Sequence, residues 1–168
     1  MPNMNTQEEC FPVVTPDGAV VGKATRKECH SGSKLLHPVI HLHVFNAAGH
    51  LYLQKRPVHK DIQPGKWDTA VGGHVDYGET VEEALQREAK EELGITGFIP
   101  QRLGCYVFES EVERELINSF KTVCNGPIVP DRFELDGGRF WTPEEIKASL
   151  GKNIFTPNFE SEFQRYFQ

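Results

Sequence analysis

The sequence predicts an α/β domain in which a mixed β-sheet lies between helices. Three observations lead to this fold class. The chain has 168 residues, which fits one domain with a sizeable core. Short apolar runs bounded by turn residues are typical of strands, and three segments begin with helix N-cap signals. We therefore expect a single domain over residues 1–168.

Apolar, strand-like runs predict the strands, and turn residues mark their ends. The turn Pro16-Asp17-Gly18 joins the first two strands into an N-terminal β-hairpin over about residues 9–25. Gly72-Gly73 allows a tight turn with close backbone approach after the fifth strand. Residues 26–36 read as a polar connector or short helix, and 57–66 as a loop. In order, the expected strands cover 10–15, 19–25, 39–45, 51–54, 67–71, 103–109, 116–124 and a short segment ending at 140–141.

The best-defined helix is expected just after Thr80. Thr80 and Glu83 form a capping box, which satisfies free backbone N–H groups at a helix start. Gly94 suits the left-handed position after a helix, so the helix should end near Leu93. Between these limits an apolar stripe is formed by Val81, Ala84, Leu85, Ala89 and Leu93.

Two further helices are expected near the C-terminus. Thr142 and Thr156 start them, and in both a proline occupies the first helical position, where its missing N–H costs nothing. In the last helix Phe159, Phe163 and Phe167 are four residues apart, so they should pack on the body of the domain.

Three glutamates of the first helix, Glu88, Glu91 and Glu92, are spaced so that their carboxylates share one face. Like charges at this spacing repel, and Arg87, one turn before Glu91, neutralises only part of the repulsion. A divalent cation would offset the rest, and clustered carboxylate oxygens suit a hard ion such as Mg²⁺ or Mn²⁺. The alternative is an acidic helix face that is simply solvated.

Composition excludes several classes of function. The net charge of −6 argues against binding to nucleic-acid polymers or membrane surfaces, and no apolar run approaches the length of a transmembrane helix. Residues 1–9 contain neither a basic region nor an apolar core, so no secretion signal is expected. The four cysteines form no CxxC pair, as is usual for reduced thiols in a cytoplasmic protein.

Residues 73–95 resemble a Nudix box, the signature of a superfamily that mostly hydrolyses diphosphates linked to another group. The fixed spacing carries the resemblance, because a glutamate-rich helix alone is common. The matching positions are Gly73, Glu79 after five residues, Arg87-Glu88-Ala89 after seven more, Glu91-Glu92 and Gly94-Ile95.

The resemblance implies the Nudix fold, an α/β/α sandwich with a mixed central sheet, over nearly the whole chain. It implies that a backbone carbonyl of Gly72 joins the glutamate side chains around the metal. It also implies supporting roles for Glu79 and Arg87, since the glutamate at this position usually buttresses the arginine of the helix. The implied metal ligands are Gly72, Glu88, Glu91 and Glu92.

A second set of metal-ligand residues comes from three separate segments. His30 and His37 flank a short segment, and His74 follows the glycine pair. Glu113 and Glu115 are two apart in an expected strand, so their side chains should share a face. This layout resembles isopentenyl-diphosphate isomerase, a Nudix-fold enzyme that holds one divalent metal in this way. Imidazole with carboxylate suits Mn, Zn or Fe; the alternative is that Glu113 or Glu115 only assists the box metals or the catalytic water.

The chain departs from the isomerase at one position. The isomerase places a catalytic cysteine just before its Gly-His step, where this chain has Gly72. Alkene isomerisation needs an acid and a base across the carbon skeleton, so half of the apparatus is missing here. His41 and His43 alternate in a strand and are expected to be structural. We therefore predict an isomerase-like Nudix hydrolase.

The predicted reaction is metal-dependent hydrolysis of the diphosphate linkage in a nucleoside diphosphate derivative or a similar organic diphosphate. Mg²⁺ or Mn²⁺ would neutralise developing charge and activate a water. Glu92 is the expected central ligand, and the base is Glu91 or one of Glu113 and Glu115. Lys55 and Arg56 follow a strand and are candidates for contact with substrate phosphates, the alternative being a surface basic pair.

Two other functions stay open from the sequence. One is the isomerase reaction, and the other is a catalytically silent, ligand-sensing Nudix domain, against which the complete glutamate set argues. Substrate choice should depend on loops near 58–65, 107–114 and 128–137, where no base-recognition pattern is readable. Oligomeric state is undetermined, with a homodimer as one alternative.

Overall fold

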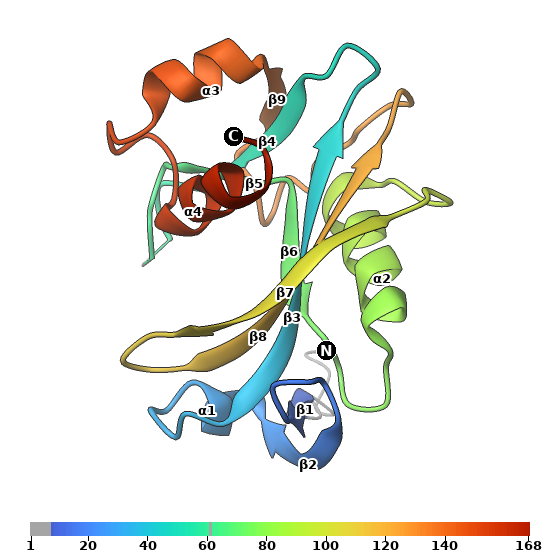
Figure 1. Cartoon of the computed structure of the whole chain (residues 1–168), viewed down its shortest axis with the longest axis vertical. Helices are drawn as coiled ribbons and strands as arrows, with labels where there is room; N and C mark the ends of the chain where they lie inside the picture. Colours follow the sequence, from blue (N-terminus) through green and yellow to red (C-terminus); the bar gives the residue numbers. More distant parts are fainter. Residues whose placement is uncertain (1–7, 61) are drawn as a thin grey trace.

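The computed structural model describes residues 8–60 and 62–168, and its centre is a mixed seven-stranded sheet (Figure 1). The strands of this sheet are β3 (Leu36–Phe45), β4 (Leu51–Lys55), β5 (Trp67–Thr69), β6 (Val71–His74), β7 (Gln101–Glu109), β8 (Arg114–Val123) and β9 (Gly138–Trp141). The order is β5-β4-β3-β8-β7, with β6 paired to β3 and β9 paired to β4. Only β3 and β8 pair in parallel among these strands, which brings the starts of both to one end of the sheet.

Helices cover both faces of the sheet. Helix α2 (Val81–Leu93) packs on one face, and α3 (Pro143–Ser149) and α4 (Pro157–Tyr166) form the layer on the other (Figure 1). Side chains alternate along β3, so Ile40 and Leu42 enter the core beneath α2, whereas His41 and His43 reach toward α4. The predicted α/β/α arrangement with a mixed sheet is confirmed.

The helix ends follow the local signals in the sequence. Thr80 and Thr142 each form a reciprocal capping box, and Thr156 accepts a hydrogen bond from the backbone N–H of Phe159. Gly94 ends α2 with φ 67°, a left-handed conformation that glycine adopts without strain. Phe159 is fully buried in the core beneath α3 and α4, as its position on the apolar face of α4 predicts.

The segment 67–74 differs from the prediction of one strand followed by a tight glycine turn. It forms β5 and β6, separated at Ala70, and Gly72 and Gly73 lie within β6 opposite His41 and Ile40. The turn prediction is therefore wrong. The reason is that β3 and β4 pair directly only beside their connecting loop. Farther from that loop, residues 67–74 lie between β3 and β4, and they pair first with β4 through β5 and then with β3 through β6.

The N-terminal hairpin is confirmed and forms a small sheet of its own. It consists of β1 (Cys10–Val14) and β2 (Val20–Thr25), followed by the four-residue helix α1 (Arg26–Cys29), so a short helix opens the segment expected as a connector or helix. The side chain of Phe11 is fully buried, and the backbone N–H of Tyr77 donates to the carbonyl of Cys10 at 2.8 Å. The hairpin is thereby attached beside the loop that precedes α2.

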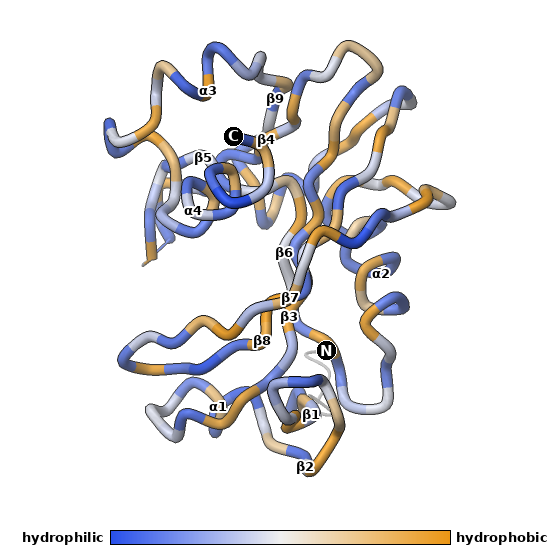
Figure 2. The backbone as a smooth tube through the Cα atoms, viewed as in Figure 1, coloured by the Kyte–Doolittle hydropathy of each residue, from blue (hydrophilic) through white to orange (hydrophobic). Residues whose placement is uncertain are grey.

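Short hydrophobic and hydrophilic stretches follow one another along the backbone (Figure 2). In the part that the structure describes, no helix combines the length and the apolar character needed to cross a membrane. Residues 1–7, to which most of the expectation about a secretion signal refers, lie outside the described residues.

Candidate functional site

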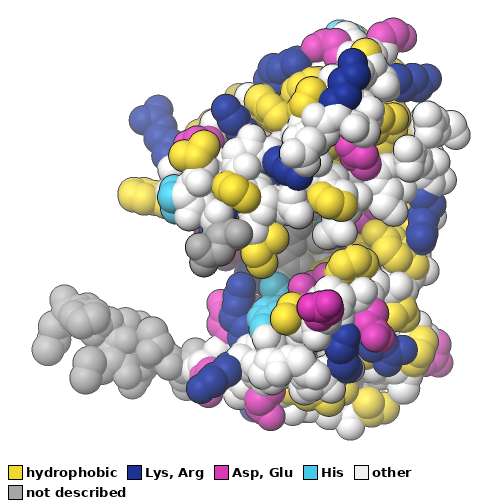
Figure 3. Space-filling view, turned by 90° about the vertical axis from the view of Figure 1, so that its left-hand side faces the viewer, with side chains coloured by type: hydrophobic (Ala, Val, Ile, Leu, Met, Phe, Trp, Pro, Cys, Tyr) yellow, Lys and Arg dark blue, Asp and Glu magenta, His cyan; other side chains and the backbone are white. Residues whose placement is uncertain are grey.

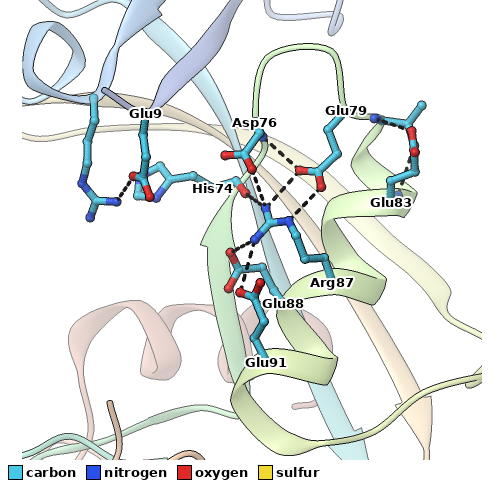
Figure 4. A network of polar contacts seen from close by, with 10 residues as sticks. Glu9, His74, Asp76, Glu79, Glu83, Arg87, Glu88 and Glu91 are labelled. Carbon is cyan, nitrogen blue, oxygen red and sulfur yellow. Dashed lines mark hydrogen bonds and ion pairs between the residues drawn. The ribbon is translucent and has the colours of Figure 1, made fainter. Parts of the chain in front are cut away.

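Arg87 is the centre of a polar network at the N-terminal half of α2 (Figure 4). Its guanidinium donates to both oxygens of Glu79, at 2.8 and 3.0 Å, to Glu88 at 2.7 Å and to the backbone carbonyl of His74 at 3.0 Å. Glu91 lies farther away, at 3.4 Å. Hydrogen bonding to Glu79 is the largest cause that raises the pKa of Arg87, against the opposing effect of burial. Glu79 and Arg87 are thus placed as the resemblance implies, with Arg87 tied to the strand that carries His74.

Glu88 and Glu92 form a carboxylate pair that Arg87 compensates only on one side. Glu92 is 5% exposed, and its Oε2 atom has no hydrogen-bond partner among the described residues. Burial is the main cause that raises the pKa of Glu92 well above its ordinary value, and the nearby charge of Glu88 adds to it. Burial likewise raises the pKa of Glu88, although Arg87 opposes this. Two carboxylates that resist ionisation together, with one oxygen left without a partner, are suited to a cation.

Gly73 is required by close packing against this pair. A Cβ atom at position 73 would lie 2.3 Å from the carboxyl carbon of Glu88, so any side chain would displace that carboxylate. A Cβ atom at Gly72 would meet only ordinary contacts, at 3.6 Å from the ring of His41. The two glycines therefore keep β6 open on both faces, with Glu88 on one side and His41 on the other.

A cavity of about 710 Å³ brings these groups together with residues from distant segments. Figure 3 shows the corresponding hollow on one side of the molecule, with histidine side chains exposed in it. The lining includes Gly72, Gly73, Glu88, Glu91 and Glu92 from the predicted site. Basic residues of the lining are Arg26, Arg56, Lys60 and Arg87. The cavity thus combines an acidic floor with cations that suit an anionic ligand.

The expected basic pair is divided by the structure. Arg56 lines the cavity, where its side chain lies 3.5 Å from Asp68 and donates to the backbone carbonyl of Ile62. Lys55 ends β4 and is not among the cavity-lining residues. Successive residues of an extended segment point to opposite sides, which explains why only one of the pair faces the cavity.

The second predicted constellation is also brought together. The parallel pairing of β3 with β8 places His37 opposite Glu115. The Nε2 atom of His30 is 2.8 Å from Glu113, and that of His37 lies 3.9 Å from Glu113 and 4.0 Å from Glu115. His30, His37, His74 and Glu113 each offer one ligand atom, and these atoms all lie within 4.8 Å of one another.

Two histidines of this cluster, His37 and His74, are shifted toward the uncharged form. Burial is the main cause that lowers the pKa of His74 to about 3, and it also lowers the pKa of His37. Their Nε2 atoms are buried without hydrogen-bond partners among the described residues. Phe11 of the hairpin stacks on His74 with ring centroids 4.5 Å apart, so the N-terminal extension closes one side of the cluster.

Glu115 borders both parts of the site. It lines the cavity and lies 4.0 Å from the Nε2 atom of His74. Burial, followed by the charge of Glu113, raises the pKa of Glu115 to about 7, while His41 acts in the opposite direction. A carboxyl group with such a pKa can exchange a proton near neutral pH.

Several groups in or beside the site were not predicted from the sequence, among them Arg26, Lys60, Glu134 and Glu162. Glu134, in the loop before β9, lines the cavity, and its charge contributes to raising the pKa of Glu92. Glu162 of α4 is fully buried and binds both His41 and His43, the histidines expected to be structural. Glu162 carried a readable signal, because it falls on the same helical face as Phe159 and Phe163. No sequence pattern indicated Glu134, because the residues of a loop show no periodicity that would predict the direction of a side chain.

Comparison with known proteins identifies the family. The NUDIX domain model matches residues 35–159. A Nudix hydrolase of Yersinia pestis is 33% identical over 150 residues, which is 89% of this chain and 81% of that protein. An isopentenyl-diphosphate Delta-isomerase of Mycolicibacterium vanbaalenii is 31% identical over 149 residues, which is 85% of this chain and 81% of that one. The crystal structure of DR0079 from Deinococcus radiodurans has the same fold, with a TM-score of 0.80 at 24% identity over 95% of this chain and 100% of that one.

The family model and the Nudix hydrolase relatives support an enzyme of the hydrolase class. With the family model and these relatives, the chain belongs to the Nudix family. The predicted resemblance is confirmed, including its isomerase-like branch.

Proposed function

We propose that this protein is a metal-dependent hydrolase that cleaves the diphosphate linkage of a nucleoside diphosphate derivative or a similar organic diphosphate. The observation that carries the proposal is the Glu88–Glu92 pair, in which the buried Oε2 atom of Glu92 has no hydrogen-bond partner among the described residues and lies beside a cavity with basic residues in its lining. Such a pair is costly in an apoprotein and becomes favourable when a cation and an anionic ligand share the cavity.

The residues that would hold the metal are Glu88, Glu91 and Glu92 with the backbone carbonyl of Gly72. Their donor atoms are all oxygens, which fits Mg²⁺ or Mn²⁺. When bound there, such an ion would supply neutralisation of charge on the diphosphate and activation of the attacking water. Arg87 holds Glu88 in place, and Gly73 leaves the space that the Glu88 carboxylate occupies.

Two carboxylates are candidates for the base that takes the proton of the attacking water. Glu115 lies in the cavity wall with a pKa of about 7, whereas Glu91 is exposed and bound only loosely by Arg87. In either case the water oxygen attacks phosphorus, its proton passes to the glutamate, and the bridging P–O bond breaks. Replacing each by glutamine separates them, since only loss of the base shifts the pH dependence of kcat.

We further propose that Arg56 meets the substrate phosphates, because it faces the cavity and Lys55 does not. Arg26 and Lys60 line the same cavity from the hairpin side and from the loop after β4. Arg26 lies 2.7 Å from Glu9 and Arg56 lies 3.5 Å from Asp68, so in this proposal the substrate phosphates would share these two cations with the carboxylates.

We propose a second divalent metal, Mn, Zn or Fe, at His30, His37, His74, Glu113 and Glu115. Support comes from the convergence of ligand atoms and from the buried Nε2 atoms of His37 and His74, which have no hydrogen-bond partner among the described residues. Elemental analysis of the purified protein tests this. Retention of one tightly bound metal that His37→Asn abolishes would support the site, and its absence after loading would refute it.

The isomerase reaction is the second candidate function, favoured by the isopentenyl-diphosphate isomerase among the relatives and by the same histidine cluster. Against it, none of the four cysteines lines the cavity. Gly72 stands where the isomerase has its thiol, and a residue without a side chain cannot act as an acid or base. A silent ligand sensor is disfavoured because binding alone would not require a repelling glutamate pair.

The proposed setting is the cytoplasm, with one domain over residues 1–168, a small-molecule diphosphate as partner, and neither a nucleic-acid polymer nor a membrane. A homodimer is compatible with the proposal and is tested by light scattering. The net charge of −6 supports a small-molecule ligand, because a negatively charged protein repels the backbone of a nucleic-acid polymer.

The decisive assay is incubation with Mg²⁺ or Mn²⁺ and a panel of diphosphates: nucleotide sugars, nucleoside di- and triphosphates, dinucleoside polyphosphates and isopentenyl diphosphate. Released phosphate and monophosphate are measured for wild type, Glu92→Gln and the matched control Glu82→Gln, an exposed glutamate of the same helix. Cleavage that only Glu92→Gln abolishes is the expected result. Conversion of isopentenyl diphosphate to its allylic isomer without any cleavage would overturn the proposal.

A further inference from the structure

Glu162 is a fully buried carboxylate that accepts hydrogen bonds from four side chains. Its Oε1 atom accepts from His43 at 3.0 Å and from Ser119 at 2.7 Å. Its Oε2 atom accepts from Tyr106 at 2.7 Å and from the Nδ1 atom of His41. A carboxylate has about four lone-pair sites, so this hydrogen-bonding capacity is filled and no proton is needed on Glu162.

An ionised carboxylate in the protein interior requires a positive partner. Ser119 and Tyr106 are neutral donors, so the charge must come from His41 or His43. His43 is fully buried and its other ring nitrogen has no partner among the described residues, so a proton there would be a buried, unsatisfied donor. His41 does not have this disadvantage, because its side chain is 14% exposed.

The exposed edge of His41 faces the catalytic cavity. His41 is a lining residue, and the Cδ2 atom, next to Nε2 in the ring, is the side-chain atom nearest to Gly72. The Nε2–H group is therefore a donor that points into the cavity from the face of the sheet opposite to Glu88.

We propose that His41 contacts the substrate through Nε2, donating a hydrogen bond to a phosphate oxygen of the diphosphate, and that Glu162 is the positioning residue that orients its ring. This inference rests on the proposed diphosphate hydrolase function and adds a substrate-binding residue to it. Helix α4 thereby acquires a role in binding, since it carries Glu162 across the sheet from α2.

Asparagine and glutamine separate the two edges of the ring. In His41→Asn the amide can replace Nδ1 toward Glu162 but leaves nothing at the position of Nε2. In His41→Gln the amide extends toward the cavity instead. A purely structural histidine predicts that Asn is the better replacement, whereas substrate contact predicts that Gln restores more of the function.

The experiment compares wild type, His41→Asn, His41→Gln and the remote control His50→Asn. Affinity for methylenediphosphonate with Mg²⁺ is measured by calorimetry, and kcat and KM are measured on a diphosphate that the wild type cleaves. We expect His41→Asn to weaken binding and raise KM by roughly 10- to 100-fold, as for loss of a hydrogen bond to a charged group. We expect kcat to change little, His41→Gln to recover part of the affinity, and His50→Asn to match wild type.

Equal affinity and KM in wild type and His41→Asn would overturn the inference while leaving the hydrolase proposal intact. A wild type that neither binds methylenediphosphonate nor cleaves any diphosphate would overturn both. If His41→Asn does not fold, wild-type protein labelled with ¹⁵N-histidine replaces it. The His41 ring signal, assigned through its proximity to Gly72, must then shift when methylenediphosphonate is added with Mg²⁺, and an unchanged signal contradicts the contact.

Discussion

The helices on the two faces of the sheet each bury one glutamate, and the two side chains have opposite surroundings. Glu162 of α4 accepts four hydrogen bonds, and although burial acts to raise its pKa, the charge of His41 and its hydrogen bond lower it. Glu92 of α2 has an oxygen with no hydrogen-bond partner in the part of the chain that the structure describes, and burial, with the nearby charge of Glu88, raises its pKa.

This difference separates two uses of a buried carboxylate. Glu162 is fully satisfied within the protein, so it can hold other groups in place. Glu92 is left for a ligand that the protein does not supply, and a divalent cation is the ligand its oxygens prefer. Protein stability and catalysis should therefore respond in opposite ways when the two are altered.

The largest expected effect is loss of catalysis in Glu92→Gln. Loss of a ligand of the proposed metal would weaken the stabilisation of charge in the transition state, which costs roughly 10²–10³-fold in kcat. Stability without metal should stay equal or increase, because the substitution removes an uncompensated buried carboxyl. Steady-state kinetics and urea denaturation measure the two properties, with Glu82→Gln as control. If Glu92→Gln lost its activity because it unfolded, the claim that Glu92 serves catalysis and Glu162 serves stability would be contradicted.

Glu162→Ala should chiefly lower stability. Leaving His41 and His43 without their acceptor costs about 3 kcal/mol or more in the free energy of unfolding. Glu160→Ala on the same helix removes only a bond from the backbone N–H of Gly151 and should cost about 1 kcal/mol or less. Equal denaturation midpoints for the two variants would show that Glu162 is not a structural hub.

Gly73→Ala sharpens the comparison by moving a single carboxylate. The new methyl group would displace Glu88, so kcat should fall by roughly 100-fold, as for a misplaced catalytic group. The flexible side chain of Glu88 can move aside, so stability should change little. In Gly72→Ala the new methyl group would lie at ordinary contact distance, 3.6 Å from the ring of His41. This variant should therefore retain clearly more activity than Gly73→Ala in the same assay.

The pH dependence of stability should have opposite signs for the two glutamates. Above the ordinary carboxyl pKa of 4.5, unfolded Glu92 is ionised while folded Glu92 keeps its proton. The folded state then binds more protons, so metal-free stability falls as pH rises toward the folded pKa. Glu162 is ionised in the folded state at lower pH than when unfolded, so it contributes stability above pH 4.5 that is lost on acidification.

Urea denaturation from pH 3 to pH 8 in EDTA measures both contributions. Relative to wild type, Glu162→Gln should lose stability as pH rises from 3 to 4.5, where the difference levels off, whereas Glu92→Gln should gain stability progressively above pH 4.5. Difference curves with the same sign would contradict the assignment.

The smallest expected effect distinguishes Arg56 from Lys55. Arg56→Ala should raise KM by about tenfold, since it removes a charged donor from the cavity. Lys55→Ala should leave KM within about twofold, as for a surface lysine. Similar KM values for both variants would contradict the proposal that Arg56, and not Lys55, contacts the substrate phosphates.

Short-range rules account for most of what the sequence predicts correctly. Thr80, Glu83 and Gly94 set the ends of α2 through local hydrogen bonds, and helical periodicity places the box glutamates on one side. The histidine cluster was expected from its resemblance to a known site, and the parallel pairing of β3 with β8 assembles it.

Long-range pairing accounts for what the sequence misses. The division of 67–74 into β5 and β6 depends on where β3 and β4 diverge. The sequence of the segment itself does not predict this position. The Glu162 network joins positions more than 100 residues apart in sequence, His41 and His43 among them. A glutamate on the buried face of an amphipathic helix signals that a partner is needed but does not identify it.

The most direct test of the central claim is the effect of Mg²⁺ on the urea denaturation midpoint at pH 8, measured for wild type, Glu92→Gln and Glu162→Gln. A ligand that binds only the folded protein raises its stability. Mg²⁺ should stabilise wild type and Glu162→Gln by similar amounts and leave Glu92→Gln unchanged. Equal stabilisation of wild type and Glu92→Gln, or no stabilisation of wild type, would contradict a metal site at Glu92.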